Sequence, residues 1–149
     1  MARTLQEPFP FPPPRVYSGA NVPMRVIRRC ARAIAEEFHP DKIILFGSHA
    51  YGTPYEDSDV DLLIIMSCYS QHSQAVRILW RLAAPFPLDL IVRTPENLAW
   101  RLDEKESFHT TIVTLGKILH ASSEAQRAAN KIAQLAIEGM DKGDASKVD

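Results

Sequence analysis

Residues 42–65 read KIILFGSHAYGTPYEDSDVDLLII, and this stretch decides the fold. It contains two short apolar runs rich in β-branched residues, 42–46 and 60–66, and each has the length and composition of a buried strand. A glycine and a serine follow the first run at once, and an Asp-x-Asp opens the second. The stretch therefore predicts two strands of one sheet, joined by a loop with polar residues at both of its ends.

The two aspartates of the second run, Asp59 and Asp61, are spaced to act together. Side chains alternate faces along a strand, so these two point the same way, roughly 6–7 Å apart along the backbone. A third aspartate, Asp89, lies within another apolar run, 87–92. We expect its burial to be costly unless it is paired or ligates a metal. If the strands of these two runs are neighbours, Asp89 completes a cluster of three carboxylates.

Such a cluster predicts a metal site. Three carboxylates held together repel one another, and one would be forced to protonate at neutral pH unless a cation were bound. Mg²⁺ prefers oxygen ligands and is typically held by carboxylates together with substrate phosphates. Two such ions, about 3.5–4 Å apart, clamp the attacking and leaving oxygens of an in-line displacement. We therefore predict Asp59, Asp61 and Asp89 as the catalytic and metal-binding residues of phosphoryl or nucleotidyl transfer.

The glycine and serine, Gly47 and Ser48, fit the same chemistry. A glycine lets the backbone come close to a ligand. Backbone N–H groups at a turn that enters a helix form a phosphate site together with a serine hydroxyl. These two residues are the predicted binding site for the phosphates of a nucleoside triphosphate.

The rest of the chain alternates helical and strand patterns. Together with the two strands above, it predicts a protein of the α/β or α+β class, with a small mixed sheet flanked by helices. We divide the chain into a proline-rich leader (1–23), a catalytic domain (24–121), and a C-terminal helix with a disordered tail (122–149). Helical spacing or helix-start signals predict helices over 24–38, 70–84, 94–105 and 108–115, with further strands over 88–92 and 117–120.

Several side chains outside the motifs have an expected place. Trp80 and Trp100 lie in apolar helix patterns and are expected in the core, and Val76, Leu79, Trp80 and Ala83 are expected on one packed side of their helix. Tyr51 stacks on a base or packs against the protein, and the sequence leaves both open. The first helix carries Arg25, Arg28, Arg29 and Arg32 away from its apolar residues, as a solvated face or as a surface for an anionic partner.

Composition sets the remaining limits. A chain of 149 residues is long enough for about one domain. Its net charge of −1 provides no general basic field, so nucleic acid is not the expected partner. No apolar run approaches the ~20 residues that span a bilayer, and residues 1–14 lack the apolar core of a signal peptide. We expect a cytoplasmic protein without membrane association, whose Cys30 and Cys68 are reduced thiols.

The motifs resemble those of a known superfamily. Phe46-Gly47-Ser48 is followed, ten residues after the serine, by Asp59-Val60-Asp61-Leu62. This pattern resembles the nucleotidyltransferases of the DNA polymerase β-like superfamily and, more narrowly, the minimal nucleotidyltransferase (MNT) proteins. Pro87-Leu88-Asp89-Leu90-Ile91-Val92 is similar to the strand that carries the third aspartate in these proteins. The likeness covers about 24–121, so the leader and the C-terminal segment lie outside it.

The resemblance implies a palm-type fold and a role for each motif residue. Gly47 and Ser48 would bind the nucleotide phosphates, and Asp59 and Asp61 would hold both Mg²⁺ ions. Asp89 would hold the catalytic ion and help to activate the acceptor hydroxyl. Many members carry an arginine directly after the Gly-Ser, whereas this chain has a histidine, which is shorter and mostly neutral at pH 7.

The resemblance also implies an acceptor. In MNT–HEPN pairs, the MNT protein resembles an antitoxin that transfers AMP from ATP to a tyrosine of its HEPN toxin. We expect the same activity here, with a HEPN-type toxin as the protein partner and a homodimer as a further possible assembly. The alternatives are a nucleotide- or partner-binding module without turnover, which would bind Mg-ATP and transfer nothing, and a nucleotidyltransferase of aminoglycosides, which would confer resistance.

Overall fold

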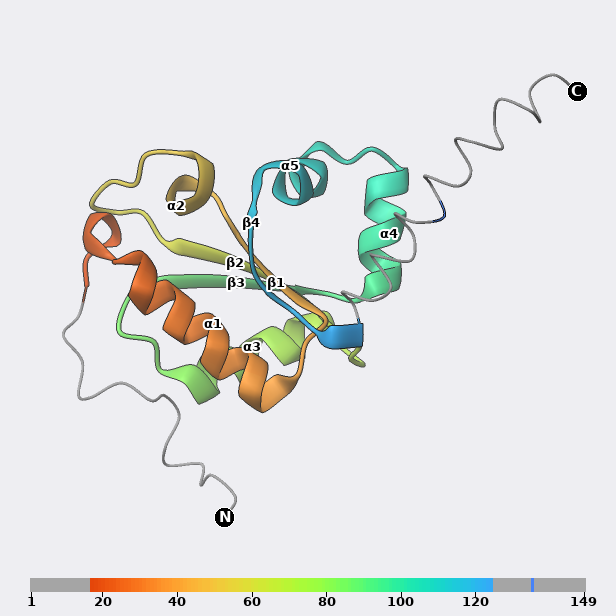
Figure 1. Ribbon diagram of the computed structural model, residues 1–149, viewed down its shortest axis with the longest axis horizontal. Helices are drawn as coiled ribbons and strands as arrows, with labels where there is room; N and C mark the ends of the chain where they lie inside the picture. The colour runs from red at the N-terminus through yellow and green to blue at the C-terminus, as the bar shows by residue number, and fades with distance from the viewer. Residues whose placement is uncertain (1–16, 125–134, 136–149) are drawn as a thin grey trace, which may run out of the picture.

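The computed structural model describes residues 17–124 and residue 135 (Figure 1). The helices and strands predicted within 24–121 are present, and their bounds differ from the expected ones by at most two residues. A short helix after the first strand, α2, was not predicted as an element. The elements are η1 (Gly19–Asn21), α1 (Met24–Phe38), β1 (Lys42–Phe46), α2 (Ser48–Tyr51), β2 (Val60–Ile65), α3 (Gln71–Leu82), β3 (Leu88–Arg93), α4 (Pro95–Asp103), α5 (Ser107–Leu115) and β4 (Lys117–Ala121).

The strands form one mixed sheet of four, in the order β3-β2-β1-β4. β1 pairs antiparallel with β2 on one side and with β4 on the other, and β2 pairs parallel with β3. A parallel pair needs a crossover connection, which α3 supplies between β2 and β3. The sequence-based prediction of a small mixed sheet flanked by helices is therefore confirmed.

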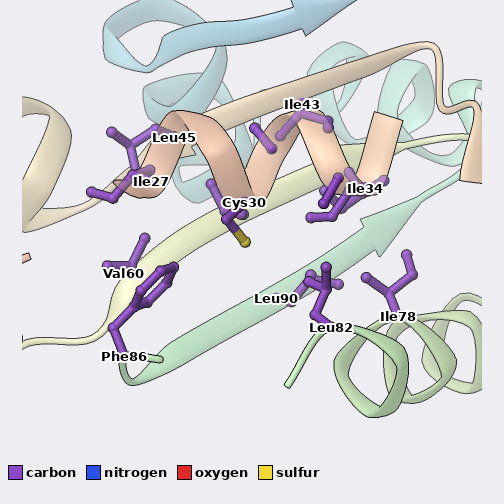
Figure 2. Packing of buried hydrophobic residues seen from close by; sticks show 14 of the residues in the cluster. Ile27, Cys30, Ile34, Ile43, Leu45, Val60, Ile78, Leu82, Phe86 and Leu90 are labelled. Atoms are coloured by element: carbon purple, nitrogen blue, oxygen red, sulfur yellow. The ribbon is translucent and has the colours of Figure 1, made fainter. Parts of the chain in front are cut away.

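Helices cover both faces of this sheet, so alternate strand residues enter two different cores. Ile43 and Leu45 of β1 lie in the larger core with Ile27 of α1 and Ile78 of α3 (Figure 2). Leu62 and Ile64 of β2 belong to the same core. The residues between them on β1 and β2 belong to a smaller core that includes Leu98 of α4 and Ile112 of α5. Each strand is therefore apolar almost throughout because both of its faces are buried.

Local signals fix the ends of the helices. Thr94 caps α4 by accepting a hydrogen bond from the Asn97 amide at 3.1 Å, and Pro95 takes the first helical position, as the sequence predicts. Ser70 caps α3 in the same way, with the Ser73 amide 3.2 Å from its hydroxyl. α1 ends at His39, whose φ of 51° places it in the left-handed region before Pro40.

One prediction about the core is wrong. α3 buries Ala75, Ile78 and Leu82, whereas Val76, Leu79, Trp80 and Ala83 are exposed. Trp80 is 83% exposed, and Trp100 of α4 is 58% exposed. The sequence of α3 offers two overlapping apolar stripes, and the one with smaller side chains is the one that faces the sheet. Helical spacing identifies a stripe, but docking on the sheet selects which stripe is buried.

The remaining sequence-based expectations are local. Cys30 and Cys68 are both free, and burial raises the pKa of the Cys30 thiol from 9.0 to about 12. Among the described residues, no helix has the length and apolar character required to cross a membrane. The predicted C-terminal helix and disordered tail lie outside the described residues, apart from 122–124 and 135. Residues 1–16 of the predicted leader also lie outside them.

Candidate active site

Two of the three predicted aspartates lie side by side on neighbouring strands. In the parallel β2–β3 pair, Asp61 is directly opposite Asp89. Asp61 shares its face of the sheet with Leu63 and Ile65, which is the face that α4 and α5 cover farther along. The adjacency expected for Asp89 is therefore present. Its expected burial is wrong, because Asp89 is the second residue of β3 and its side chain is exposed.

Gly47 allows this carboxylate to lie against the backbone. Its φ of 74° and ψ of −155° fall in a region that only glycine adopts readily. A Cβ atom at this position would lie 2.1 Å from Oδ2 of Asp61, well inside van der Waals contact. Both the conformation and the space therefore require glycine here, and they place the turn after β1 directly on the Asp61 carboxylate.

The charges around Asp61 are not balanced. Burial, the negative charges of Asp89 and Asp59, and a hydrogen bond with Asp89 raise the pKa of Asp61 from 3.8 to about 6. His49 opposes this shift more weakly. The site thus concentrates negative charge on one half-buried carboxyl group, which is the electrostatic signature of a site for a cation or for a proton.

Asp59 lies at the end of a loop that is fixed just before it. The hydroxyl of buried Ser58 accepts from the Tyr55 amide at 2.8 Å, and the Ser58 amide donates to the Tyr55 carbonyl at 2.9 Å. On the other side of Asp59, the Val60 amide donates to the Pro87 carbonyl at 2.9 Å. The backbone on both sides of Asp59 is therefore held, while its side chain remains exposed.

His49, which replaces the arginine of many similar proteins, is held by the N-terminal segment. Its Nε2 lies 2.6 Å from the carbonyl oxygen of Gly19. A carbonyl only accepts, so Nε2 carries a proton and donates it to this oxygen. Nδ1 is buried and makes no hydrogen bond with the described residues. His49 is thus a contact to η1 through Nε2.

The same segment packs tightly on the loop. A Cβ atom on Gly19 would lie 1.9 Å from the Ser58 carbonyl oxygen, so the two backbones touch. The Tyr17 amide also donates to the Pro85 carbonyl at 2.9 Å. Sequence reasoning missed this role of Gly19, because nothing near it in the sequence predicts a contact with residues 30 and more positions away.

The turn into α2 has the form that the phosphate prediction requires. Ser48 is the first residue of α2 and is half-buried. The Gly47 carbonyl accepts from the amides of Ala50 and Tyr51, both at 3.0 Å, which closes the single turn of this helix. Tyr51 is 42% exposed, so packing does not enclose it, and stacking on a base stays a prediction. Phosphate binding by Gly47 and Ser48 likewise stays a prediction.

A pair of aromatic rings lies at the end of β1 next to the site. Phe46, the residue opposite Asp61 on β1, meets the ring of Phe108 edge-to-face, with 5.7 Å between the ring centroids. Phe108 comes from α5 and is 47% exposed. It therefore brings α5 to the rim of the site, a contact that no sequence pattern indicated.

The donor atoms of the site suit a hard cation. Carboxylate oxygens are the ligands that Mg²⁺ prefers, and Asp61 with Asp89 supplies a close pair. Within residues 17–124 and 135, no group of three or more His, Cys, Asp or Glu side chains is arranged to hold a metal ion. The metal assignment of Asp59, Asp61 and Asp89 therefore stays a prediction, and its third member is the exposed Asp59.

Comparison with known proteins identifies the family. Residues 27–126 match the model of the nucleotidyltransferase domain. The chain belongs to that family. The resemblance drawn from the Gly-Ser and Asp-x-Asp motifs is thereby confirmed at the level of the superfamily, and the protein is a nucleotidyltransferase.

Other comparisons add less. No curated protein matches the chain. Among solved structures, the chain is similar to one from the crystal structure of a mutant of the toxin–antitoxin MntA-HpeT. The two share 17% sequence identity with a TM-score of 0.46, over 85% of this chain and 97% of that one.

Proposed function

We propose that this nucleotidyltransferase transfers AMP from ATP to an acceptor hydroxyl and that it requires Mg²⁺. The observation that carries the proposal is the pair of carboxylates, Asp61 and Asp89, opposite each other on parallel strands and backed by Gly47. Like charges at this separation are unfavourable unless a ligand offsets them. A cofactor cation together with a triphosphate is the ligand that the nucleotidyl-transfer chemistry of the family calls for.

The carboxylates would hold the cations. Asp61 and Asp89 form the close pair, and exposed Asp59, on its fixed loop, would complete the set by turning its side chain toward them. When bound, Mg²⁺ supplies positive charge that neutralises the phosphates and the charge that develops on the oxygens during transfer. Burial and the two neighbouring carboxylates raise the pKa of Asp61, and a bound cation would offset this cost, which supports the fit.

The other residues would position the two substrates. The Ser48 hydroxyl and the backbone at Gly47 would hold the triphosphate beside the carboxylates. Asp89, exposed at the start of β3, is reachable from solvent and would accept the proton of the acceptor hydroxyl. His49 would act indirectly, by keeping η1 against the loop that precedes Asp59.

We further propose that the acceptor is a protein, with a tyrosine hydroxyl of a HEPN-type toxin as the expected target. Two features support a large acceptor. The motifs resemble those of the MNT proteins, and both Asp59 and Asp89 are exposed rather than enclosed by the residues that the structure describes. A macromolecule can therefore bring its own hydroxyl group to the site.

Labelled nucleotide tests the proposal directly. The purified protein is incubated with ATP labelled at the α-phosphate and Mg²⁺, with and without the product of the adjacent gene. The variants are Asp59→Asn, Asp61→Asn, and Asp57→Asn as a matched control from the same exposed loop. We expect label on the partner with wild type and Asp57→Asn only.

Three other outcomes would each count against a specific part of the proposal. Label that is retained in Asp61→Asn would overturn the site. Label on an aminoglycoside instead of the partner would overturn the protein acceptor. Binding of Mg-ATP without any transfer, to the partner, RNA or small molecules, would favour a binding module.

A further inference from the structure

A groove lies between α1 and β4, away from the carboxylates. It encloses about 310 Å³. The sheet order β3-β2-β1-β4 puts it at the opposite edge from β3, while Asp61 and Asp89 lie on β2 and β3. The groove is therefore distinct from the candidate active site. Its lining consists of Arg28, Arg32 and Ala35 of α1 with Ile118, Leu119 and His120 of β4.

The β4 side of the groove is the edge of the sheet. The pairing of β4 with β1 is irregular here, because Ile43 pairs with His120 and Ile44 with Ile118, which leaves Leu119 as an extra residue in β4. Within the described part of the chain, β4 pairs with β1 alone, which leaves its other edge without a strand. Ile118 is 60% exposed there. An edge of this kind is a template for a further strand.

The α1 side of the groove carries uncompensated positive charge. Arg28 and Arg32 are one helical turn apart, both are exposed, and neither makes a hydrogen bond or ion pair with the described residues. Like charges at this spacing destabilise a helix. An anionic group between them would reverse that effect, and the guanidinium geometry suits carboxylates in particular.

We propose that this groove binds an extended acidic segment of a partner protein, which adds to the free edge of β4. The strand edge would supply main-chain hydrogen bonds, and Ile118 and Leu119 would supply an apolar contact. Arg28 and Arg32 would select peptides that carry Glu or Asp side chains. Charge argues against a second copy as the occupant, because a two-fold axis through β4 would bring each pair of arginines toward the other pair. The strand edge and apolar lining favour peptide over nucleic acid.

Selection from a peptide library tests this inference on the full chain. A phage-displayed library of random 12-residue peptides is selected on wild type after depletion on the Arg28→Glu/Arg32→Glu variant. The enriched peptides are then synthesised with a fluorophore and titrated by anisotropy. Arg25→Glu is the matched control, because Arg25 is also exposed on α1 but does not line the groove.

We expect enriched peptides in which acidic residues alternate with β-branched or aromatic ones. Their affinity should fall at least about tenfold in Arg28→Glu/Arg32→Glu and change little in Arg25→Glu. Hydrogen exchange should slow at the amides of residues 118–120 when the peptide binds. Circular dichroism melting of each variant separates lost binding from lost folding.

The inference is overturned if no arginine-dependent peptide is enriched, if enriched peptides lack acidic residues, or if exchange slows elsewhere and not in β4. Tighter arginine-dependent binding of a ten-nucleotide RNA than of any peptide would overturn it in favour of nucleic acid. The result is independent of the proposed transfer reaction, because Asp61→Asn should bind the same peptides with unchanged affinity.

Discussion

The two ends of the β2–β3 pair surround their charged side chains with different partners, although both ends use the same face of the sheet. At the carboxyl end, Arg93 donates from Nε to Nε2 of buried His109 at 3.1 Å, and Nδ1 of His109 lies 2.7 Å from Glu106. Glu106 also accepts from Arg101 at 2.8 Å. At the amino end, roughly 13 Å away along the strand, Asp61 meets Asp89, another carboxylate.

The difference separates structural charge from functional charge. In the Arg93–His109–Glu106–Arg101 network, Glu106 faces both Arg101 and His109, and Nε of Arg93 donates to His109. Burial and the like charge of Arg101 lower the pKa of Arg93, and the opposite charge of Glu106 acts against that shift. At Asp61 the neighbours add to the cost of burial and raise its pKa. A fold that retains such repulsion leaves its compensation to a ligand, which is why the carboxylates and not the histidine network mark the candidate site.

The largest expected effect comes from removing the Asp61 charge at the amino end of the β2–β3 pair. Asp61→Asn should lower nucleotidyl transfer by roughly 10²–10³-fold, the range for losing one electrostatic contact with a transition state. Asp57→Asn should leave it within about twofold, because its side chain is exposed in the preceding loop. Initial rates with labelled ATP measure both, and equal rates for the two variants would show that Asp61 is not part of the site.

Removing the centre of the network should have the converse effect. His109→Ala deletes a side chain that is 1% exposed and leaves Nε of Arg93 without its acceptor, so the free energy of unfolding should fall by about 2–4 kcal/mol. Transfer per folded molecule should change by less than about threefold. Urea unfolding and rate measurements decide the matter, and a loss of transfer without a loss of stability would place His109 in the catalytic machinery.

Substitution of Gly47 should change both the stability of the fold and the geometry of the candidate site. Gly47→Ala should destabilise the fold by about 1–3 kcal/mol through its backbone conformation and should displace the Asp61 carboxylate. The double variant Gly47→Ala/Asp61→Ala relieves the contact with Oδ2. Its unfolding free energy should exceed the additive expectation by about 0.5 kcal/mol or more. Strict additivity would show that the contact is unimportant.

The smallest predicted effect is on the pH dependence of stability without metal. The folded state binds more protons at Asp61 than the unfolded state does between pH 3.8 and about 6. Burial of the ionised carboxylate and its repulsion by Asp89 and Asp59 therefore lower the unfolding free energy as pH rises through this window. Above pH 6, Asp61→Asn should be more stable than wild type by about 1 kcal/mol, a value discounted because the side chain is half exposed. The difference should vanish below pH 4. Urea titrations in the presence of a chelator measure this difference in unfolding free energy at each pH. A difference that does not change with pH would show that the ionisation of Asp61 is not its cause.

Much of the site follows from local patterns. The apolar runs gave the bounds of β1 and β2 almost as observed. The shared direction that residue spacing predicts for Asp59 and Asp61 stays a prediction, because Asp59 precedes β2. The glycine after β1 was correctly expected to allow a close approach, although the group that approaches it in the structure is Asp61. These predictions depend on strand alternation and turn chemistry, which act over a few residues.

Long-range contacts were not predictable in the same way. The hydrogen bond from His49 to Gly19 joins residues 30 positions apart, and the bond from Arg93 to His109 joins residues 16 apart. The exposure of Trp80 was also missed. In each case the local sequence allows more than one arrangement of similar energy, and contacts with distant elements select among them.

By itself, then, the sequence determined the strands, most of the helices and the family to which the motifs point. The tertiary structure alone decided that Asp89 lies opposite Asp61, that Ala75 and not Trp80 of α3 faces the sheet, and that β4 ends the sheet beside two arginines. Periodicity is set by covalent geometry within a segment. Strand order and the choice of buried face are set by the packing of all segments at once.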